Sequence, residues 1–382
     1  MTPKWRQHFL TELGIPSEQV SCARVSLGVD GTVCARHTDA AAPHRSRVSL
    51  VDPRRPAERR SWPVGHVDSA VANPCRPLVA LRAGTLVQVF DVESERLVSQ
   101  CRVMQGVEFW VWLDRDTLCL VTDAAVLHWA VQREYRHGPP ATLAQRTSQH
   151  TRGEVEPEEV FSRHAKLRGA ELVGYRGDPA GQWLALTGLY LDRTGCVQGL
   201  TQLYSRHTRL DQVIEAQAVA LAELALSANP GPSVLLVAAQ RRGAGHKGKV
   251  HVVELGPHRQ GNSALTSHSD SLLFPLTEAR DFPVSVQGLV LVLSKYGLLF
   301  VADADTAAVL CCQRIGTHTV FASVPDPHTH GILGVSRSGQ VLSLCVREAA
   351  LLRCVPPHAP RSTILRRLLD SRRDSSRKIT AV

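Results

Sequence analysis

A glycine-rich segment, GAGHKG at Gly243 to Gly248, has residue types and a spacing that could bind a phosphate. It fits the pattern G-x-G-x-x-G, in which glycines let the backbone approach a dinucleotide and the following helix points its N-terminus at the pyrophosphate. That chemistry needs a helix after the glycines, but the next segment, VHVVELG, alternates like a strand. We therefore interpret the motif as a hairpin loop and expect no nucleotide cofactor.

A histidine pair could in principle bind a metal. His328 and His330 lie in the segment PDPHTHG, but two imidazoles do not complete a zinc site, and the sequence suggests no third ligand nearby. The chain also lacks a G-x-S-x-G, H-E-x-x-H or P-loop motif, and its carboxylates do not pair as a general acid and base. We therefore expect that the protein binds no metal and no cofactor and has no enzymatic activity. A hydrolase whose carboxylates or arginines converge on one cluster from distant parts of the chain remains an alternative, although the sequence shows no sign of such a cluster.

The elements that position these residues read as strands. From Val20 to Val346, apolar or alternating runs such as LVALRAGTLVQVFDVE and WLALTGLYL are divided by polar or glycine turns, and no helical pattern of comparable length interrupts them. This pattern predicts an all-β fold, for which a sandwich, a barrel and a propeller are all candidates.

A repeated strand ending favours the propeller. Alternating apolar residues lead to an anchor, which is usually followed by a small or acidic residue; the anchors are Val51, Phe90, Trp129, Tyr204, Val253, Ala302 and Cys345. Intervals of roughly 40 to 50 residues are typical of four-stranded propeller blades. One interval is much longer and contains the polar stretch 131–160. We expect a seven-bladed β-propeller over residues 1–346, with 131–160 as an inserted, disordered loop.

The remaining segment, 347–382, is expected to be the start of a linker and a basic tail. Residues 357–382 hold seven basic residues against two acidic ones, which accounts for much of the net charge of +9. Ser362 could cap a short helix whose apolar residues are Ile364, Leu365, Leu368 and Leu369. A basic tail on a mildly charged body argues against nucleic acid as a partner.

Composition limits the other function classes. The chain contains no apolar run long enough to span a membrane and no N-terminal secretory pattern, so we expect a cytoplasmic protein with at most peripheral membrane association. The ten cysteines form no CxxC pair, and many lie in or beside apolar runs. They are expected to be reduced thiols that pack as small hydrophobic residues.

The segment FWVWLDRDTLCLVTDAAVLHW, from Phe109 to Trp129, resembles the N-terminal domain of the clathrin heavy chain, a seven-bladed propeller. Further stretches are similar in the same order, including 68–93 for the second blade, 175–189 for the fourth and 331–346 for the last. The resemblance covers roughly residues 5–350. It implies a domain that binds short adaptor peptides in grooves between blades.

The resemblance places a first peptide groove between blades 1 and 2, where family members bind apolar and acidic clathrin-box peptides. The residues that match are Val79, Gln88 and Phe90, with Arg96 as a nearby cation. A family threonine falls on Leu86, a lysine on Glu95 and an arginine on Trp62. A carboxylate in place of a cation would repel an acidic peptide, so this groove departs from the family pattern.

A second groove, between blades 4 and 5, accepts an apolar arrestin-type loop in the family. Its pattern is better kept, with matches at Trp183, Leu203, Gln212 and Ile214, although these residues could also serve blade packing alone. A third family site, at the centre of the propeller, is poorly matched: its aromatic residue falls on Cys22 and its glutamine on Glu171, while Val173 is conservative.

The resemblance implies a non-enzymatic, peptide-binding module of vesicle trafficking in coated pits and coated vesicles. Its expected partners are endocytic adaptor and arrestin-type peptides, and clathrin coats indirectly. Because the helical leg of the family is not part of this sequence, we expect that the chain cannot form a triskelion by itself. The alternative is a degenerate or truncated paralogue with a structural role or no binding role.

Overall fold

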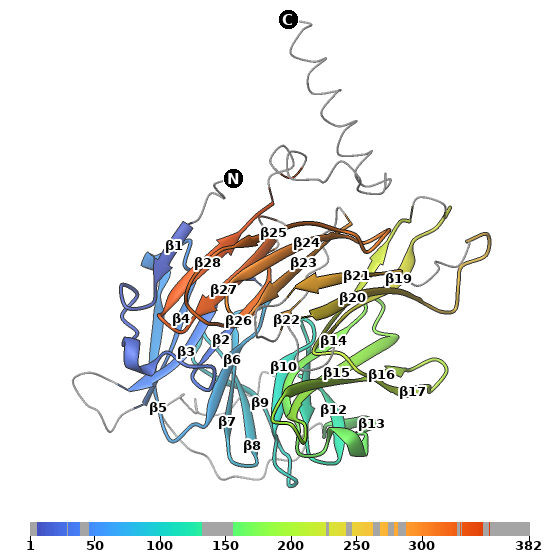
Figure 1. The fold of residues 1–382 in the computed structure, drawn as a ribbon. Helices are drawn as coiled ribbons and strands as arrows, with labels where there is room; N and C mark the ends of the chain where they lie inside the picture. Colours follow the sequence, from blue (N-terminus) through green and yellow to red (C-terminus); the bar gives the residue numbers. More distant parts are fainter. Residues whose placement is uncertain are drawn as a thin grey trace, which may run out of the picture.

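The computed structural model describes residues 6–28, 30–38, 46–131, 156–226, 229–241, 247–262, 268–273, 279–281, 288–326, 329, 331–346 and 351. Within these residues, the strands form seven four-stranded antiparallel sheets. Figure 1 shows the sheets arranged as blades around a common centre. We number the blades along the chain, starting with the sheet that begins at β2. The predicted all-β, seven-bladed propeller is confirmed.

Each of the first four blades is a continuous run of four strands. Blade 1 consists of β2 (Val25–Leu27), β3 (Val33–Thr38), β4 (Ser46–Val51) and β5 (Arg60–Val64). Blade 2 consists of β6 (Ser69–Ala72), β7 (Leu78–Ala83), β8 (Leu86–Asp91) and β9 (Leu97–Arg102). Blade 3 consists of β10 (Phe109–Trp112), β11 (Thr117–Val121), β12 (Ala125–Ala130) and β13 (Glu158–Ser162). Blade 4 consists of β14 (Glu171–Gly177), β15 (Trp183–Leu191), β16 (Val197–Ser205) and β17 (Asp211–Ile214).

The later blades follow the same order until the last. Blade 5 consists of β18 (Ala218–Leu224), β19 (Ser233–Arg241), β20 (Lys247–Leu255) and β21 (His268–Leu273). Blade 6 consists of β22 (Ala279–Asp281), β23 (Leu289–Ser294), β24 (Leu298–Asp303) and β25 (Val309–Arg314). Blade 7 consists of β26 (Val320–Asp326), β27 (Gly331–Ser336), β28 (Gln340–Leu344) and β1 (Arg6–Phe9). Short 3₁₀ turns are η1 (Ser17–Gln19), η2 (Pro56–Glu58) and η3 (Ala165–Leu167).

Blade 7 closes the ring because it takes strands from both ends of the described chain. β1 pairs antiparallel with β28, with Arg6 opposite Ser343 and Phe9 opposite Gln340. Figure 1 shows β1 lying beside β28. The first strands of successive blades also contact one another around the ring, and β26 of blade 7 contacts β2 of blade 1. The N-terminal strand therefore joins the end of the propeller to its beginning.

The hydrophobic core is divided into seven layers, one at each junction between neighbouring blades. Strand β7 shows how the sequence builds two layers at once. Leu78 and Ala80 pack toward blade 3, while Val79 and Leu81 pack toward blade 1. Successive side chains of a strand point to opposite faces of its sheet. Because both faces are buried, these strands are continuous apolar runs rather than alternating ones.

The repeated anchors lie at corresponding places in the blades. Six lie in the third strand of their blade, and Cys345 follows directly after β28. The acidic residue after an anchor has a physical role in the turn toward the fourth strand. Asp91 Oδ1 accepts hydrogen bonds from the backbone N–H groups of Glu93 and Ser94, and Asp303 Oδ1 accepts from those of Asp305 and Thr306. Such caps are typical of aspartate in turns.

Some sequence predictions fall partly or wholly outside the described residues. Strand β13 begins at Glu158, inside the expected 131–160 loop, so this loop is shorter than predicted at its C-terminal end; residues 132–155 lie outside the described part. Lys247 and Gly248 of the GAGHKG motif begin β20, which pairs antiparallel with β19, in agreement with a hairpin; residues 243–246 lie outside the described part. His328, His330 and the segment 352–382, with its expected helix, are outside the described residues. Among the described residues, none of the nine cysteines is joined to another in a disulfide.

Arg54 fastens blade 1 to blade 7 near the closure of the ring. Its guanidinium donates to Asp52 Oδ1 at 3.0 Å and to the backbone oxygen of Asp30, and it lies 3.9 Å from Asp326 Oδ1 on β26. The Asp326 carboxylate is buried and also accepts a hydrogen bond from Ser343. A buried carboxylate is unfavourable unless a cation or hydrogen bonds compensate it. Arg54 supplies part of that compensation across the junction.

We predict that Arg54→Ala lowers the free energy of unfolding by about 1–3 kcal/mol, because it removes a charged partner from buried Asp326. Arg55 is the matched control: it also pairs with Asp52, but its side chain is 64% exposed. Arg55→Ala should lower the free energy of unfolding much less than Arg54→Ala does, because solvent screens an exposed ion pair. Urea denaturation of both variants measures the difference. Equal losses would show that Arg54 does not stabilise the closure.

His128 on β12 connects blade 3 to blade 4. The Arg206 guanidinium donates to its Nδ1 at 2.8 Å, and its Nε2 lies 2.8 Å from the hydroxyl of Tyr175 on β14. With Nδ1 accepting, Nε2 carries the proton and donates to Tyr175. Burial, together with the Arg206 charge, lowers the pKa of His128 to about 4. The imidazole is therefore neutral in the folded protein at neutral pH.

The folded protein should lose stability as the pH falls from about 6.5 to about 4. In this window the unfolded chain takes up a proton on His128 that the folded chain does not, so the free energy of unfolding falls by about 2 kcal/mol between pH 7 and pH 5. His128→Gln should remove this increment, whereas His207→Gln, at an exposed position, should keep it. Denaturation curves at the two pH values provide the test, and an unchanged acid sensitivity in His128→Gln would contradict it.

Candidate functional site

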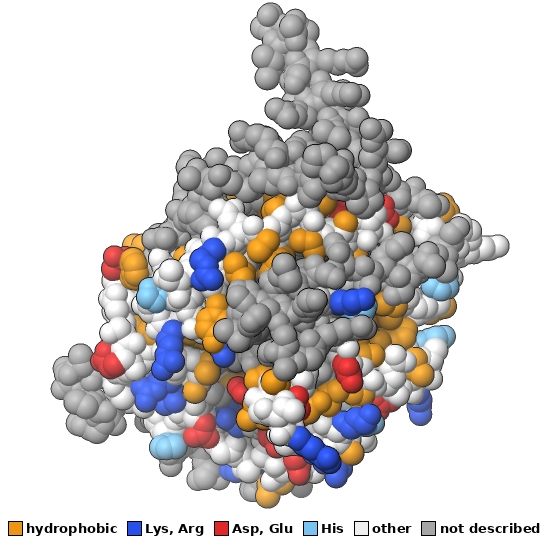
Figure 2. Space-filling model, in the orientation of Figure 1, with side chains coloured by type: hydrophobic (Ala, Val, Ile, Leu, Met, Phe, Trp, Pro, Cys, Tyr) orange, Lys and Arg blue, Asp and Glu red, His pale blue; other side chains and the backbone are white. Residues whose placement is uncertain are grey.

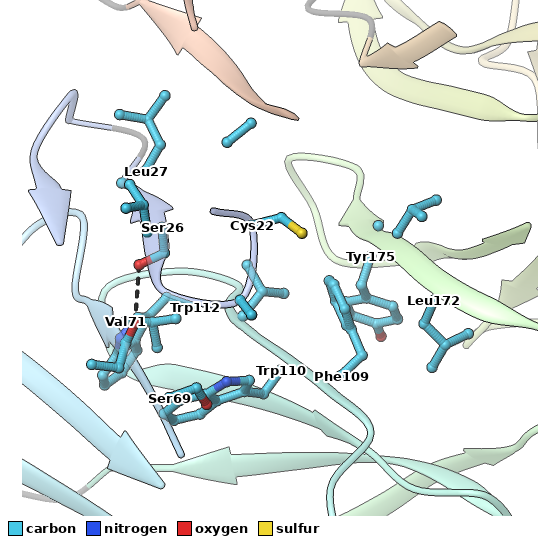
Figure 3. A pocket seen from close by; sticks show the side chains of 18 of the residues that line it. Cys22, Ser26, Leu27, Ser69, Val71, Phe109, Trp110, Trp112, Leu172 and Tyr175 are labelled. Atoms are coloured by element: carbon cyan, nitrogen blue, oxygen red, sulfur yellow. Dashed lines mark hydrogen bonds between the residues drawn. The ribbon is translucent and has the colours of Figure 1, made fainter. Parts of the chain in front are cut away.

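A cavity of about 480 Å³ lies inside the ring of first strands. It is lined by residues of β2, β6, β10, β14 and β26, and much of its wall is apolar or aromatic. Figure 3 shows Trp110 and Phe109 on one side, with Leu172 and Tyr175 beside them, and the Cys22 sulfur pointing toward Phe109 and Tyr175. The cavity can therefore hold an apolar group.

Two of the carboxylates that line this cavity have structural partners. Glu108 accepts from Arg163, a cation buried in blade 3, and Asp68 accepts from the backbone N–H of Gly84. Glu171 is exposed at the start of β14. The structure brings Cys22, Glu171 and Val173, which the sequence assigned to a central site, into the lining of this one cavity. These three residues contribute a thiol, a carboxylate and an isopropyl group to the lining, and none of them supplies the aromatic ring expected at the family site.

Figure 2 shows the charged surface of one face of the propeller. Basic and acidic side chains are interspersed there, with apolar side chains between them. Within the described residues, no group of three or more histidine, cysteine or acidic side chains is arranged to hold a metal ion. In the same part of the chain, no helix has the length and apolar character needed to cross a membrane.

The junction of blades 1 and 2 holds the first set of predicted site residues. Val79 and Phe90 face each other across β7 and β8, and they are only 0% and 3% exposed. The Gln88 amide donates to Gln100 Oε1 at 3.1 Å, and Arg96 is exposed. The structure therefore brings these residues to one blade, but it leaves only Gln88 and Arg96 accessible.

Trp62 covers this junction. It lies on β5 opposite Val48 and packs in the same apolar layer as Val79 and Phe90, and its Nε1 donates to Glu95 Oε1 at 3.0 Å. Sequence reasoning identified Trp62 and Glu95 as separate departures from the family pattern, but it missed the bond between them. Two departures that map to one groove were the signal that could have revealed it.

The junction of blades 4 and 5 holds the second set. Trp183 and Leu203 lie in its apolar layer and are 8% and 2% exposed. The Trp183 Nε1 donates to the backbone oxygen of Gly256, in the turn that follows β20 of blade 5, at 3.1 Å. Gln212 is exposed and Ile214 is half-buried at the outer strand β17. All four predicted residues therefore meet at one junction, with two of them at its accessible rim.

Comparison with known proteins agrees with this architecture. No family model matches the chain. It is 31% identical over 351 residues to clathrin heavy chain 2 of Homo sapiens and 32% identical over 359 residues to clathrin heavy chain 2 of Oryza sativa subsp. japonica. Each alignment covers 90% of this chain but 20% of the relative, so the chain spans about a fifth of the length of these curated relatives.

Solved structures support the fold alone. A chain in the structure titled "Crystal Structure of Mitotic Checkpoint Complex" superposes with a TM-score of 0.55 at 13% identity, over 90% of this chain and 92% of that one. At such identity the likeness reports the propeller and no function. The sequence relationship goes further, since it extends in order through the described blades. The chain is thus a divergent clathrin-heavy-chain-like propeller, related to the N-terminal region of that family.

Proposed function

We propose that this propeller is a non-enzymatic, peptide-binding module of vesicle trafficking, and that it binds apolar, arrestin-type peptides at the junction of blades 4 and 5. One observation carries the proposal: Trp183, Leu203, Gln212 and Ile214 converge on this junction. The relationship to clathrin heavy chains supports the trafficking role. The partners in this proposal are short adaptor peptides, and the location is the cytoplasm, at coated pits and vesicles.

The blade 4–5 junction has the chemistry for an extended apolar segment. Trp183 and Leu203 form an apolar base, and partly buried side chains border it: Ile214 on blade 4, and Leu221 and Val234 on blade 5. Gln212 lies opposite Leu203 on the outer strand, where its amide can hydrogen-bond a peptide backbone. Apolar contacts would then supply affinity, and the amide would orient the peptide.

Binding at a single junction is expected to be weak. A disordered peptide loses conformational entropy when it becomes ordered, and a short segment buries little area in return. Linking several sites raises the overall affinity, because each later contact becomes intramolecular. A single propeller would therefore exchange peptides quickly, as suits transient contacts with adaptors.

The blade 1–2 junction is a poorer candidate for acidic peptides. Val79 and Phe90 are buried, and Glu95 and Glu93 place carboxylates at its outer end. An acidic peptide would meet like charge there. We therefore rank apolar peptides at blades 4 and 5 above acidic clathrin-box peptides at blades 1 and 2.

Isothermal titration calorimetry of the folded chain should show that an apolar, leucine-rich peptide binds more tightly than the same peptide with acidic substitutions. Ile214→Ala or Gln212→Ala should weaken the binding about 5- to 10-fold, which corresponds to about 1–1.4 kcal/mol. Val98→Ala, at a similarly half-buried position on the outer strand of blade 2, is the control and should leave the affinity unchanged.

Two outcomes would contradict the proposal. If neither peptide class binds, the chain is better described as a propeller with a structural role alone. If binding persists unchanged in both rim variants and in Trp183→Ala, the peptide is held elsewhere, and the central cavity lined by Trp110 becomes the site to test next.

A further inference from the structure

The Trp62 side chain fills the space at the blade 1–2 junction that a ligand side chain would otherwise occupy. It comes from the outermost strand of blade 1, yet its side chain is only 6% exposed, because it packs in the layer shared with blade 2. That layer includes Val79 and Phe90 of blade 2 and Val48 of blade 1. An indole thus fills the apolar part of the junction from the outside.

Glu95 holds the polar edge of this indole. Its Oε1 accepts the Nε1 hydrogen of Trp62 at 3.0 Å, so the bond crosses from blade 2 to blade 1. Glu95 has a φ of +56°, a left-handed conformation that side-chain-bearing residues adopt rarely. The turn that imposes it is capped by Asp91. The backbone therefore fixes where the Glu95 side chain leaves the turn, and the bond to Trp62 orients its carboxylate, although the residue as a whole is exposed.

Glu93, the other carboxylate of this turn, has a different partner. Glu93 is 64% exposed, and its Oε1 lies 3.9 Å from the Arg60 guanidinium. Arg60, Ser61, Val92 and the two glutamates border an open hollow at the outer edge of Trp62. The hollow itself is thus bordered by two carboxylates and one paired cation, and the apolar interior lies behind the indole.

We propose that Trp62 is a built-in occupant of the blade 1–2 junction, that Glu95 is its latch, and that this pair determines which peptides the junction accepts. The inference rests on the proposed peptide-binding function. An apolar side chain can enter only where the indole now lies, so Trp62 must leave before a peptide is seated. Acidic flanks are repelled by Glu95 and Glu93, so an entering apolar peptide needs neutral or basic flanks.

The latch is tested without any peptide. In protein with ¹⁵N-labelled tryptophan, the indole signal of Trp62 is identified by its loss in Trp62→Phe, and its hydrogen exchange is followed by NMR. Glu95→Ala should accelerate this exchange at least tenfold, because the acceptor is gone. Glu93→Ala, which removes the other carboxylate of the turn, should change it less than twofold. Equal exchange in wild type and Glu95→Ala would overturn the latch.

The specificity is tested with a leucine-rich peptide carrying aspartate flanks, by fluorescence anisotropy. The measurement is made in an Ile214→Ala background, which weakens the proposed blade 4–5 site. In that background the chain with native Trp62 and Glu95 should bind the peptide weakly, and the added changes Trp62→Ala/Glu95→Lys should raise the affinity at least tenfold. Trp62→Ala alone should prefer the same peptide with lysine flanks. Circular dichroism establishes that each variant is folded, and Val98→Ala, which lies in the apolar layer on the other face of blade 2, should leave the new binding intact in the same background.

These readouts separate the two proposals. A failure of apolar peptides at blades 4 and 5 would contradict the proposed function but would leave the indole exchange result unaffected. A chain with native Trp62 and Glu95 that binds the acidic peptide as tightly as the folded double variant, or a folded double variant that gains no binding, would overturn the role of Trp62 and Glu95. Should the double variant fail to fold, the exchange rates in Glu95→Ala and Glu93→Ala decide the latch.

Discussion

The whole structure depends on the burial of both faces of every sheet against its two neighbours. In β7, Leu78 packs toward one neighbouring blade and Val79 toward the other, and the same division recurs around the ring. An open arc of such blades would expose an apolar face at each end. Closure removes both faces, and it requires β1 to pair with β28 from the far end of the described chain. Bringing such distant segments together carries an entropic cost of loop closure. The burial of the two apolar faces offsets this cost.

The same junctions that form the core are also the places where a partner could bind, and these two demands conflict. A junction filled to native packing density has no room for a guest side chain. Blades 1–2 and 4–5 show two versions of this compromise, each with a tryptophan whose N–H crosses to the next blade. Trp183 donates to a backbone oxygen, which exists whatever the residue, whereas Trp62 donates to the side chain of Glu95. A substitution of the accepting residue can therefore abolish or reverse only the second contact.

The fold and the number of blades were predictable because they depend on repeats and apolar patterns that can be read directly from the sequence. The anchors lie at the third strands, and the acidic residues that follow several of them cap turns whose geometry is local. The beginning of β13 was missed because EEVFS carries two charges and joins the sheet only as an outer strand, where one face needs no apolar cover. The Trp62–Glu95 bond was missed for another reason. It joins residues 33 positions apart on different blades, and no periodicity reports a contact between side chains of separate sheets.

At the junction of blades 1 and 2, the positions that match the family pattern differ from the positions that we propose to decide binding. Val79 and Phe90 match the pattern at blades 1 and 2, but both are buried, so any propeller of this type needs apolar residues there whether or not it binds a peptide. Agreement at such sites supports the fold and carries little information about a ligand. The departures at Trp62 and Glu95 lie where a partner would arrive. At about 30% identity, apolar layers tolerate exchange of one hydrophobic residue for another, while one new carboxylate at a rim reverses the local charge. A substitution at the rim can therefore alter the surface offered to a partner while the ring is kept.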